Sequence, residues 1–149
     1  MILGIDIGKK YGLCKLREGE YPEVDYIDKE FLADELYKID SSYESVLVIY
    51  ERVNANPRFG VKSCFTFGYE LGWLEALLTR AGLTKAEVVS PVVWKNRLNV
   101  HSKQDAILFV EARWDLDLII PAGGRVPNHN MADAVCIAYY GSLKWGSFL

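Results

Sequence analysis

The chain has 149 residues, half of them hydrophobic, and a formal net charge of −3. This length and apolar fraction predict one domain, residues 1–149, with a core of its own, and exclude a two-domain protein. The three cysteines, Cys14, Cys64 and Cys136, lack metal-binding spacing, which excludes a zinc site and indicates small buried thiols in a reducing compartment.

The apolar stretches are too short for a membrane protein. The longest, such as Val46 to Tyr50, have the length of a strand, and no charged leader precedes the first strand. We therefore expect a cytoplasmic protein with no membrane partner. The negative net charge argues mildly against nucleic-acid binding. Because the acids concentrate between Glu18 and Glu44 while several Lys and Arg lie in loops, the chain can still have a local basic surface.

The first predicted strand, Met1 to Gly8, contains an isolated acid, Asp6. The aliphatic residues around it predict a buried central strand, where an unpaired ionised carboxylate would cost several kcal/mol. Asp6 therefore needs a side chain that offsets its charge, or it binds a metal. The simpler alternative is a strand-end aspartate held by backbone N–H groups.

The next elements predict a sheet that begins antiparallel and continues parallel. Residues 11–16 and 21–27 have strand patterns on either side of a turn at 17–20, which predicts a meander. Residues 30–39 have helical spacing, with Asp28 as the cap. Residues 45–50 are uniformly apolar, which is typical of a parallel strand buried on both faces, and this strand ends in a second isolated acid, Glu51.

A loop from Arg52 to Gly60 leaves that strand at the end where α/β proteins build their sites. The elements expected after it are a helix over 61–81 capped by Gly82, a strand over 87–90, a helical turn over 92–98, a helix from the cap Ser102 to Trp114, an irregular stretch over 118–130 and an apolar helix over 131–144. In the first of these helices, Phe65 and Leu71 are expected mainly in the core. The last helix begins beside a third isolated acid, Asp133.

The three isolated acids are expected to meet in space. If the strand over 45–50 pairs parallel with the first strand and the last helix packs across both, Asp6, Glu51 and Asp133 converge. Carboxylate oxygens suit Mg²⁺ or Mn²⁺. Two such ions about 3.5–4 Å apart can activate a water and stabilise the leaving oxygen in phosphodiester hydrolysis.

The order β-β-β-α-β-α-β-α with these acids resembles the RNase H-like fold, and within it the RuvC-like Holliday junction resolvases, over nearly the whole chain. The matching motifs are Gly4-Ile5-Asp6-Ile7-Gly8, Ile49-Tyr50-Glu51-Arg52-Val53 and Met131-Ala132-Asp133-Ala134 followed by Ile137-Ala138. The phage-encoded members are resembled by Phe65-Thr66-Phe67-Gly68, by Gly72-Trp73-Leu74-Glu75 and by Ser90-Pro91-Val92-Val93-Trp94-Lys95.

The resemblance implies an α/β fold with a five-stranded mixed sheet of three antiparallel and then parallel strands, flanked by helices. It also implies a metal-dependent endonuclease that cleaves four-way DNA junctions in recombination and repair, in a bacterial or phage-infected cell. Members of this family act as homodimers in which each subunit cuts one strand, so a two-fold symmetric dimer is expected here.

The expected fourth metal ligand departs from the family pattern. The family usually has Asp or His three or four residues before the last acid, and this chain has His129 and Asn130 there. Both positions can reach a cation shared with Asp133. Neutral His and Asn suit Mn²⁺ better than Mg²⁺. A helix N-cap remains the alternative for Asn130, and a surface loop histidine the alternative for His129.

Several residues are candidates for contact with DNA. Phe59 lies in a polar loop beside Glu51, where a ring could wedge into an opened base step. The basic candidates, for which solvated surface is the alternative, are Lys9, Arg58, Lys62, Lys95, Arg97 and Lys103.

Two other functions fit parts of the pattern. An Asp-x-Gly strand also occurs in actin-like and sugar-kinase phosphate sites, although that architecture needs a second such domain to close on a nucleotide. A junction-binding protein that has lost cleavage fits the missing fourth acid. We expect an endonuclease that uses two Mg²⁺ or Mn²⁺ ions.

Overall fold

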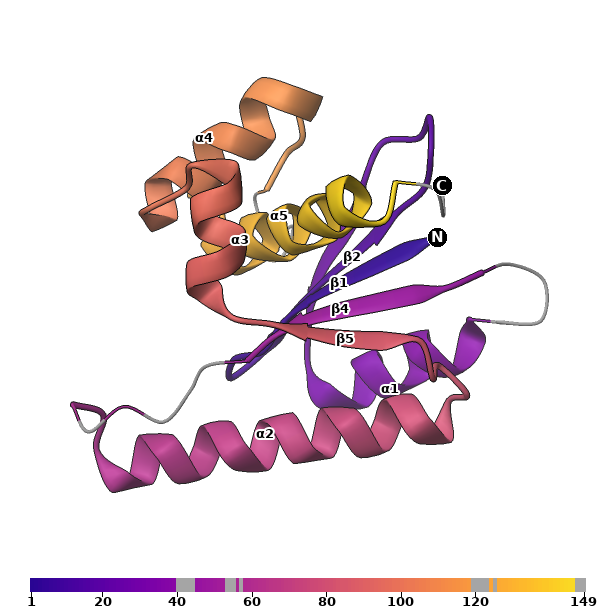
Figure 1. The fold of residues 1–149 in the computed structure, drawn as a ribbon, viewed down its shortest axis with the longest axis vertical. Helices are drawn as coiled ribbons and strands as arrows, with labels where there is room; N and C mark the ends of the chain where they lie inside the picture. The colour runs from indigo at the N-terminus through magenta and orange to yellow at the C-terminus, as the bar shows by residue number, and fades with distance from the viewer. Residues whose placement is uncertain (40–44, 53–55, 57, 119–123, 125, 147–149) are drawn as a thin grey trace.

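The computed structural model describes residues 1–39, 45–52, 56, 58–118, 124 and 126–146. Five strands form one mixed sheet in the order β3-β2-β1-β4-β5 (Figure 1). The strands are β1 (Ile2–Asp6), β2 (Tyr11–Leu16), β3 (Glu23–Ile27), β4 (Leu47–Glu51) and β5 (Ala86–Val89). β1, β2 and β3 pair antiparallel, whereas β4 pairs parallel with β1 and with β5. This arrangement confirms the predicted sheet.

The helices cover both faces of the sheet. They are α1 (Lys29–Lys38), α2 (Val61–Arg80), α3 (Pro91–Leu98), α4 (Lys103–Trp114) and α5 (His129–Lys144). Figure 1 shows α1 and α2 on one side and α3, α4 and α5 on the other, with the N-terminal end of α2 projecting beyond the sheet. In the described part of the chain, no helix is both long enough and apolar enough to cross a membrane.

The alternation of side chains in β1 supplies both cores. Ile2 belongs to the core beneath α3, α4 and α5, whereas Leu3 and Ile5 belong to the core beneath α1 and α2. Successive side chains of a strand point to opposite faces, so a central strand covered on both sides must be apolar at nearly every position. All five residues of β1 are buried, which explains its continuous aliphatic sequence.

Helix α5 lies unusually close to the sheet because two glycines lie beneath it. A Cβ added to Gly4 would be 2.3 Å from the carbonyl oxygen of Ala134, and a Cβ added to Gly12 would be 2.3 Å from that of Asn130. Any side chain at these positions would push the helix away from β1 and β2. The glycines therefore set the height of α5, and with it the position of Asp133.

Several boundaries differ from the sequence predictions because local contacts move them. Tyr21 is 71% exposed and lies outside β3, and Glu51 is inside β4 because Glu51 pairs with Val89. The predicted helical turn is a two-turn helix, α3, that begins at Pro91, where proline is favourable because no N–H is needed. Gly82 lies one residue beyond the C-cap of α2, with a φ of +73° that favours glycine.

Two core predictions were wrong, and the end of a segment predicted to be irregular is helical. Phe65 is 77% exposed on the outer face of α2, whereas Leu71 packs against the core as expected. Cys14 and Cys136 are buried, but Cys64 is only half-buried because it lies near the projecting end of α2. Much of the irregular segment predicted over 118–130 lies outside the described residues, and its final part, from His129, is the start of α5.

Candidate functional site

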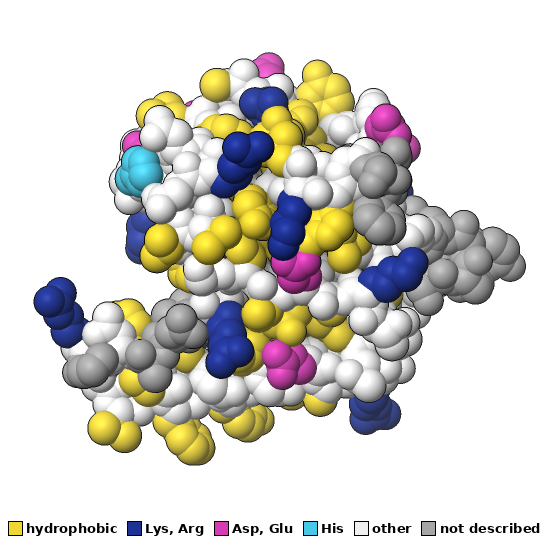
Figure 2. All heavy atoms as spheres, in the orientation of Figure 1, with side chains coloured by type: hydrophobic (Ala, Val, Ile, Leu, Met, Phe, Trp, Pro, Cys, Tyr) yellow, Lys and Arg dark blue, Asp and Glu magenta, His cyan; other side chains and the backbone are white. Residues whose placement is uncertain are grey.

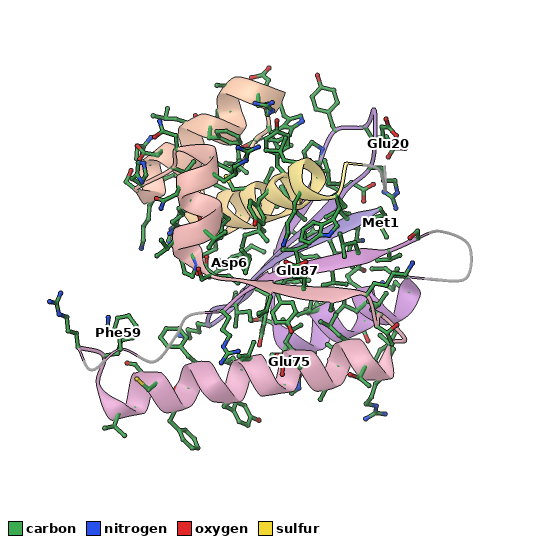
Figure 3. The ribbon with its side chains drawn as sticks, in the orientation of Figure 1. Met1, Asp6, Glu20, Phe59, Glu75 and Glu87 are labelled. Atoms are coloured by element: carbon green, nitrogen blue, oxygen red, sulfur yellow. The ribbon has the colours of Figure 1, made fainter. Side chains whose placement is uncertain are left out.

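Asp6 and Glu51 end two neighbouring parallel strands. Ile5 in β1 pairs with Tyr50 in β4, so the next residue of each strand, Asp6 or Glu51, lies at the same edge of the sheet. Adjacent strands are about 4.8 Å apart. Asp6 points to the face that α5 covers, because Gly4, two residues earlier, lies against that helix. Figure 3 shows Asp6 at this edge, near the start of α3.

Asp133 in α5 completes a group of three carboxylates that repel one another. Burial raises the pKa of Asp6 well above its usual range, and the charges of Asp133 and Glu51 raise it further. Burial likewise raises the pKa of Asp133 to about 6, again with a contribution from Glu51. The same cause, burial, raises the pKa of Glu51. The three carboxylates from β1, β4 and α5 therefore influence one another electrostatically in the folded chain.

Two side chains of α3 stabilise the ionised form of these carboxylates, one by a hydrogen bond and one by its charge. Trp94 Nε1 donates a hydrogen bond of 2.6 Å to Glu51 Oε2, and this bond lowers the pKa of Glu51. The ammonium group of Lys95, which is half-buried, lowers the pKa values of Asp6, Glu51 and Asp133. Lys95 thus lies close enough to influence all three carboxylates, whereas Trp94 forms a hydrogen bond with Glu51 alone.

Lys103 and His129 lie at the same end of the molecule as Asp133. Lys103 is the first residue of α4, after the N-cap Ser102, and its charge lowers the pKa of Asp133. His129 is the first residue of α5 and is half-buried. Its pKa is lowered by burial and by the charges of Lys103 and Lys95. His129 is therefore not the exposed loop histidine of the alternative interpretation.

The N-cap of α5 is Asn128, so the alternative of a cap role for Asn130 is wrong. Asn128 Oδ1 accepts hydrogen bonds from the N–H groups of Asn130, at 2.9 Å, and of Met131, at 3.1 Å. The helix starts two residues earlier than predicted, because its cap lies upstream. Asn130 is half-buried in the first turn, with its carbonyl oxygen against Gly12.

A hollow beside Glu51 opens toward α2. Its lining residues are Ile7, Glu51, Arg52, Phe67 and Leu71. The ring of Phe67 lies 6.2 Å from that of Phe59, which is 41% exposed. Figure 3 shows Phe59 on the loop at the projecting end of α2, well away from Asp6.

The basic candidates occupy different surfaces. Arg58 and Lys62 are exposed at the projecting end of α2, and Lys9 is exposed between β1 and β2. Arg97 lines a separate groove between α3 and α5. Residues two positions apart on a helix point about 200° apart, so Arg97 faces away from Lys95. The structure therefore groups Lys95 and Lys103 with the carboxylates but not Arg97.

The carboxylates of Asp6, Glu51 and Asp133 suit hard divalent cations, although they do not enclose a single ion. Among the residues that the structure describes, no three His, Cys, Asp or Glu side chains lie close enough to hold one ion. Mg²⁺ takes only one or two carboxylates and keeps several waters, so a closed protein cage is not required. One buried and two partly buried carboxylates that repel one another are the kind of environment that a divalent cation neutralises. The chemistry of the donors thus fits Mg²⁺ or Mn²⁺.

Three contributors to the site do not emerge from the sequence patterns. They are Trp94, which is noticeable in the sequence only within a motif, Gly12, which has no distinguishing neighbours, and Asn128, in place of which the sequence suggests Asn130 as the N-cap. A signal for Asn128 does exist, because Asn is a preferred N-cap. Nothing in the local sequence around Trp94 or Gly12 indicates which distant residue each one contacts.

Comparison with solved structures finds RuvC of Thermus thermophilus. Its structure without DNA has a TM-score of 0.61 and 18% sequence identity, over 97% of this chain and 96% of that chain. RuvC in complex with a Holliday junction substrate has a TM-score of 0.62 and 16% identity, over 98% and 96%. No family model and no curated protein sequence matches. This chain therefore has the RuvC-like, RNase H-like fold that its motifs predicted.

Proposed function

We propose that this protein is a divalent-cation-dependent endonuclease that cleaves branched DNA, as a Holliday junction resolvase of the phage-encoded type. The observation that carries the proposal is the meeting of three partly buried carboxylates from β1, β4 and α5 beside a lysine. The fold supports it, because one of the RuvC structures with the same fold holds a Holliday junction substrate.

Asp6, Glu51 and Asp133 would hold two Mg²⁺ or Mn²⁺ ions, with His129 or Asn130 as a fourth ligand. When bound, such ions activate a water and stabilise the leaving oxygen of a phosphodiester. Lys95 would contact the scissile phosphate, since its ammonium group acts on all three carboxylates. The open arrangement leaves room for phosphate oxygens to complete the coordination.

The DNA would extend from the carboxylates across the surrounding surface. We assign phosphate contacts to the exposed or half-buried cations Lys9, Arg58, Lys62, Lys95, Arg97 and Lys103. We assign the role of a wedge between bases to the ring of Phe59. Lys103 begins α4, and the positive end of a helix favours a phosphate there. Phe59 is available because a large part of its ring is exposed.

A second copy of the chain would pack against the outer face of α2. Val61 is 88% and Phe65 77% exposed, and they share one helical stripe with Gly68 and Gly72. Nothing lies within 4 Å of a Cβ placed on either glycine, so another backbone can approach closely. Figure 2 shows hydrophobic side chains along the lower edge of the molecule, over α2. Exposed apolar patches of this kind mark interfaces.

We further propose that residues 1–149 act as one nuclease domain in the cytoplasm of a bacterial or phage-infected cell. A junction-binding protein that no longer cleaves is the second candidate, because His129 and Asn130 occupy the positions before Asp133 where an acid would complete the site. Neutral ligands lower the negative charge that holds Mg²⁺.

A cleavage assay on four-way, Y-shaped and linear duplex DNA, with Mg²⁺ or Mn²⁺, tests the proposal. We expect metal-dependent cleavage of the branched substrates and little of the linear duplex. Tight junction binding without cleavage in either metal would support the second candidate. Hydrolysis of a nucleotide without DNA would instead support a kinase-like phosphate site.

Asp6→Asn is the matched inactive variant. It is expected to abolish cleavage while junction binding stays equal or becomes tighter, because the change removes a metal ligand and a charge that repels phosphate. Cleavage rate and binding affinity are measured on the same junction. Equal cleavage rates for the variant and the parent would show that Asp6 is not part of the catalytic centre.

A further inference from the structure

Trp94 is fully buried, and it lies at the end of β4 because the neighbouring strand β5 leads directly into α3. β5 runs parallel to β4, with Val89 opposite Glu51, and α3 begins two residues after Val89. Trp94, in the first turn of α3, therefore returns to the strand end at which Glu51 lies. Its side chain is 0% exposed and donates a hydrogen bond of 2.6 Å from Nε1 to Glu51 Oε2.

The partners of this tryptophan are unusual for a residue that only fills a core. A buried indole N–H needs an acceptor, and a backbone carbonyl would serve. Here the acceptor is a carboxylate oxygen at the strand end beside Asp6, and the Lys95 ammonium lies 5.1 Å from the centroid of the same ring. One rigid side chain thus contacts an anion at its edge and a cation over its face.

An indole has a property that suits a partner of a metal ligand. It donates one hydrogen bond and carries no charge. A Lys or Arg bound to Glu51 would neutralise the carboxylate, whereas Trp94 fixes its direction and leaves its negative charge available. The bond occupies one of about four acceptor sites on the carboxylate, so the other sites remain available to a cation.

We propose that Trp94 is a positioning residue, which orients Glu51 through its indole N–H and Lys95 through the face of its ring. In these orientations, Glu51 would bind a metal ion and Lys95 would contact the phosphate of the same phosphodiester. This inference rests on the proposed function, because it assigns Glu51 to the metal and Lys95 to the phosphate. Groups that orient metal ligands typically change metal affinity or activity by about 10- to 100-fold when they are lost.

The hydrogen bond can be measured without any cleavage. The chain has four tryptophans, so its proton–nitrogen correlation spectrum should contain four indole N–H signals. The signal that disappears in Trp94→Phe should shift in Glu51→Gln, and it should shift in the parent protein on titration with Mg²⁺. A Trp94 signal that neither Glu51→Gln nor Mg²⁺ moves would overturn the proposal.

Cleavage then separates positioning from packing. In Trp94→Phe, and with benzothienylalanine in place of Trp94 alone, the Mg²⁺ concentration for half-maximal cleavage should rise about 10- to 100-fold. Benzothienylalanine keeps the shape of the side chain and removes only the N–H donor, so it remains informative if Trp94→Phe folds poorly. At saturating Mg²⁺ the cleavage rate of both variants should return to near that of the parent protein.

Trp145→Phe is the matched control. Trp145 also has a lysine over its ring, with Lys144 Nζ at 4.2 Å, but it lies twelve residues beyond Asp133, about 18 Å along α5. Its Mg²⁺ requirement should equal that of the parent protein. An unchanged requirement with benzothienylalanine at position 94 would overturn the positioning role and leave the nuclease function intact. A parent protein that neither binds Mg²⁺ nor cleaves would overturn the proposed function itself, and the inference with it.

Discussion

The Asp133 carboxyl group links the charge of the site to the stability of the fold. Burial and Glu51 raise its pKa from about 3.8 to about 6, so in this pH window the folded chain holds a proton that the unfolded chain releases. Without divalent cations, the free energy of unfolding should therefore fall as pH rises from about 4 to about 6, by on the order of 3 kcal/mol for this group. Asp6 and Glu51 shift in the same direction.

Urea unfolding in a metal chelator, from about pH 4 to about pH 8, measures this effect. Asp133→Asn should be more stable than the parent at the upper end of the range and should show a smaller loss of stability with pH. Added Mn²⁺ or Mg²⁺ should raise the stability of the parent most at high pH, where the carboxylates are ionised. The same pH profile for the parent and for Asp133→Asn would contradict the assignment.

The two residues before Asp133 should determine the choice of metal. His129 and Asn130 offer a nitrogen and a neutral amide, so we expect the parent to favour Mn²⁺ over Mg²⁺. Asn130→Asp should raise Mg²⁺-supported cleavage if Asn130 is the ligand, and His129→Asp should do so if His129 faces the ions. Since Asn128 is the N-cap, neither change removes the cap.

Titration of cleavage against each metal, with both variants, distinguishes these outcomes. An acid in the first turn of α5 is also favourable for the helix dipole, so a loss of folding is not expected from either change. If the metal preference stays the same in both variants, Asp6, Glu51 and Asp133 complete the site without a fourth side chain.

At the scale of elements, the close approach of α5 to the sheet positions Asp133 and its neighbours. Gly12→Ala should destabilise the fold by about 1–3 kcal/mol, because the added methyl group would overlap the backbone of Asn130. It should also weaken metal-dependent cleavage, since the turn that it displaces carries His129 and Asn130.

Gly141→Ala is the matched control. Its added methyl group would overlap the side chain of Ile49 near the far end of α5, eight residues beyond Asp133. We expect a similar loss of stability with a smaller change in the metal concentration for half-maximal cleavage. Denaturant unfolding and metal titration are measured for both variants. Equal effects on the metal requirement would mean that both glycines act only through stability.

At the scale of the whole molecule, the outer stripe of α2 should determine the oligomeric state. Phe65→Glu should convert the proposed dimer into a monomer, because it places a charge on the contact face, whereas its cost to the fold should stay within about 0.5 kcal/mol at this exposed position. Leu108→Glu, on the opposite side of the sheet in α4 and 53% exposed, should leave the dimer intact.

Sedimentation of the parent and both variants measures the change, and cleavage of a junction labelled on two strands tests its consequence. The monomer should cut the two strands independently, since no second site is held opposite the first. A parent that sediments as a monomer, or a Phe65→Glu variant that remains a dimer, would exclude this face as the interface.

The sequence by itself determined the order of the elements and the identity of the three acids. Period-two and period-3.6 patterns report which face of an element is buried, and an acid inside an aliphatic run is conspicuous because burial of a charge is costly. Asp6, Glu51 and Asp133 are therefore recognisable from their neighbours in the chain, and the motifs around them predict the RuvC-like fold. The helix start at His129 was missed by two residues, because a cap is defined by its hydrogen bonds.

Only the tertiary structure decided which distant residues meet. Trp94 binds Glu51 across 43 positions of sequence, and Gly12 lies beneath the turn that carries Asn130. Phe65 is a large apolar residue yet is exposed, because it lies nine residues before Leu74 and so on the opposite side of α2, near the end that projects beyond the sheet. Such contacts depend on the height and angle at which elements pack, which local patterns do not encode.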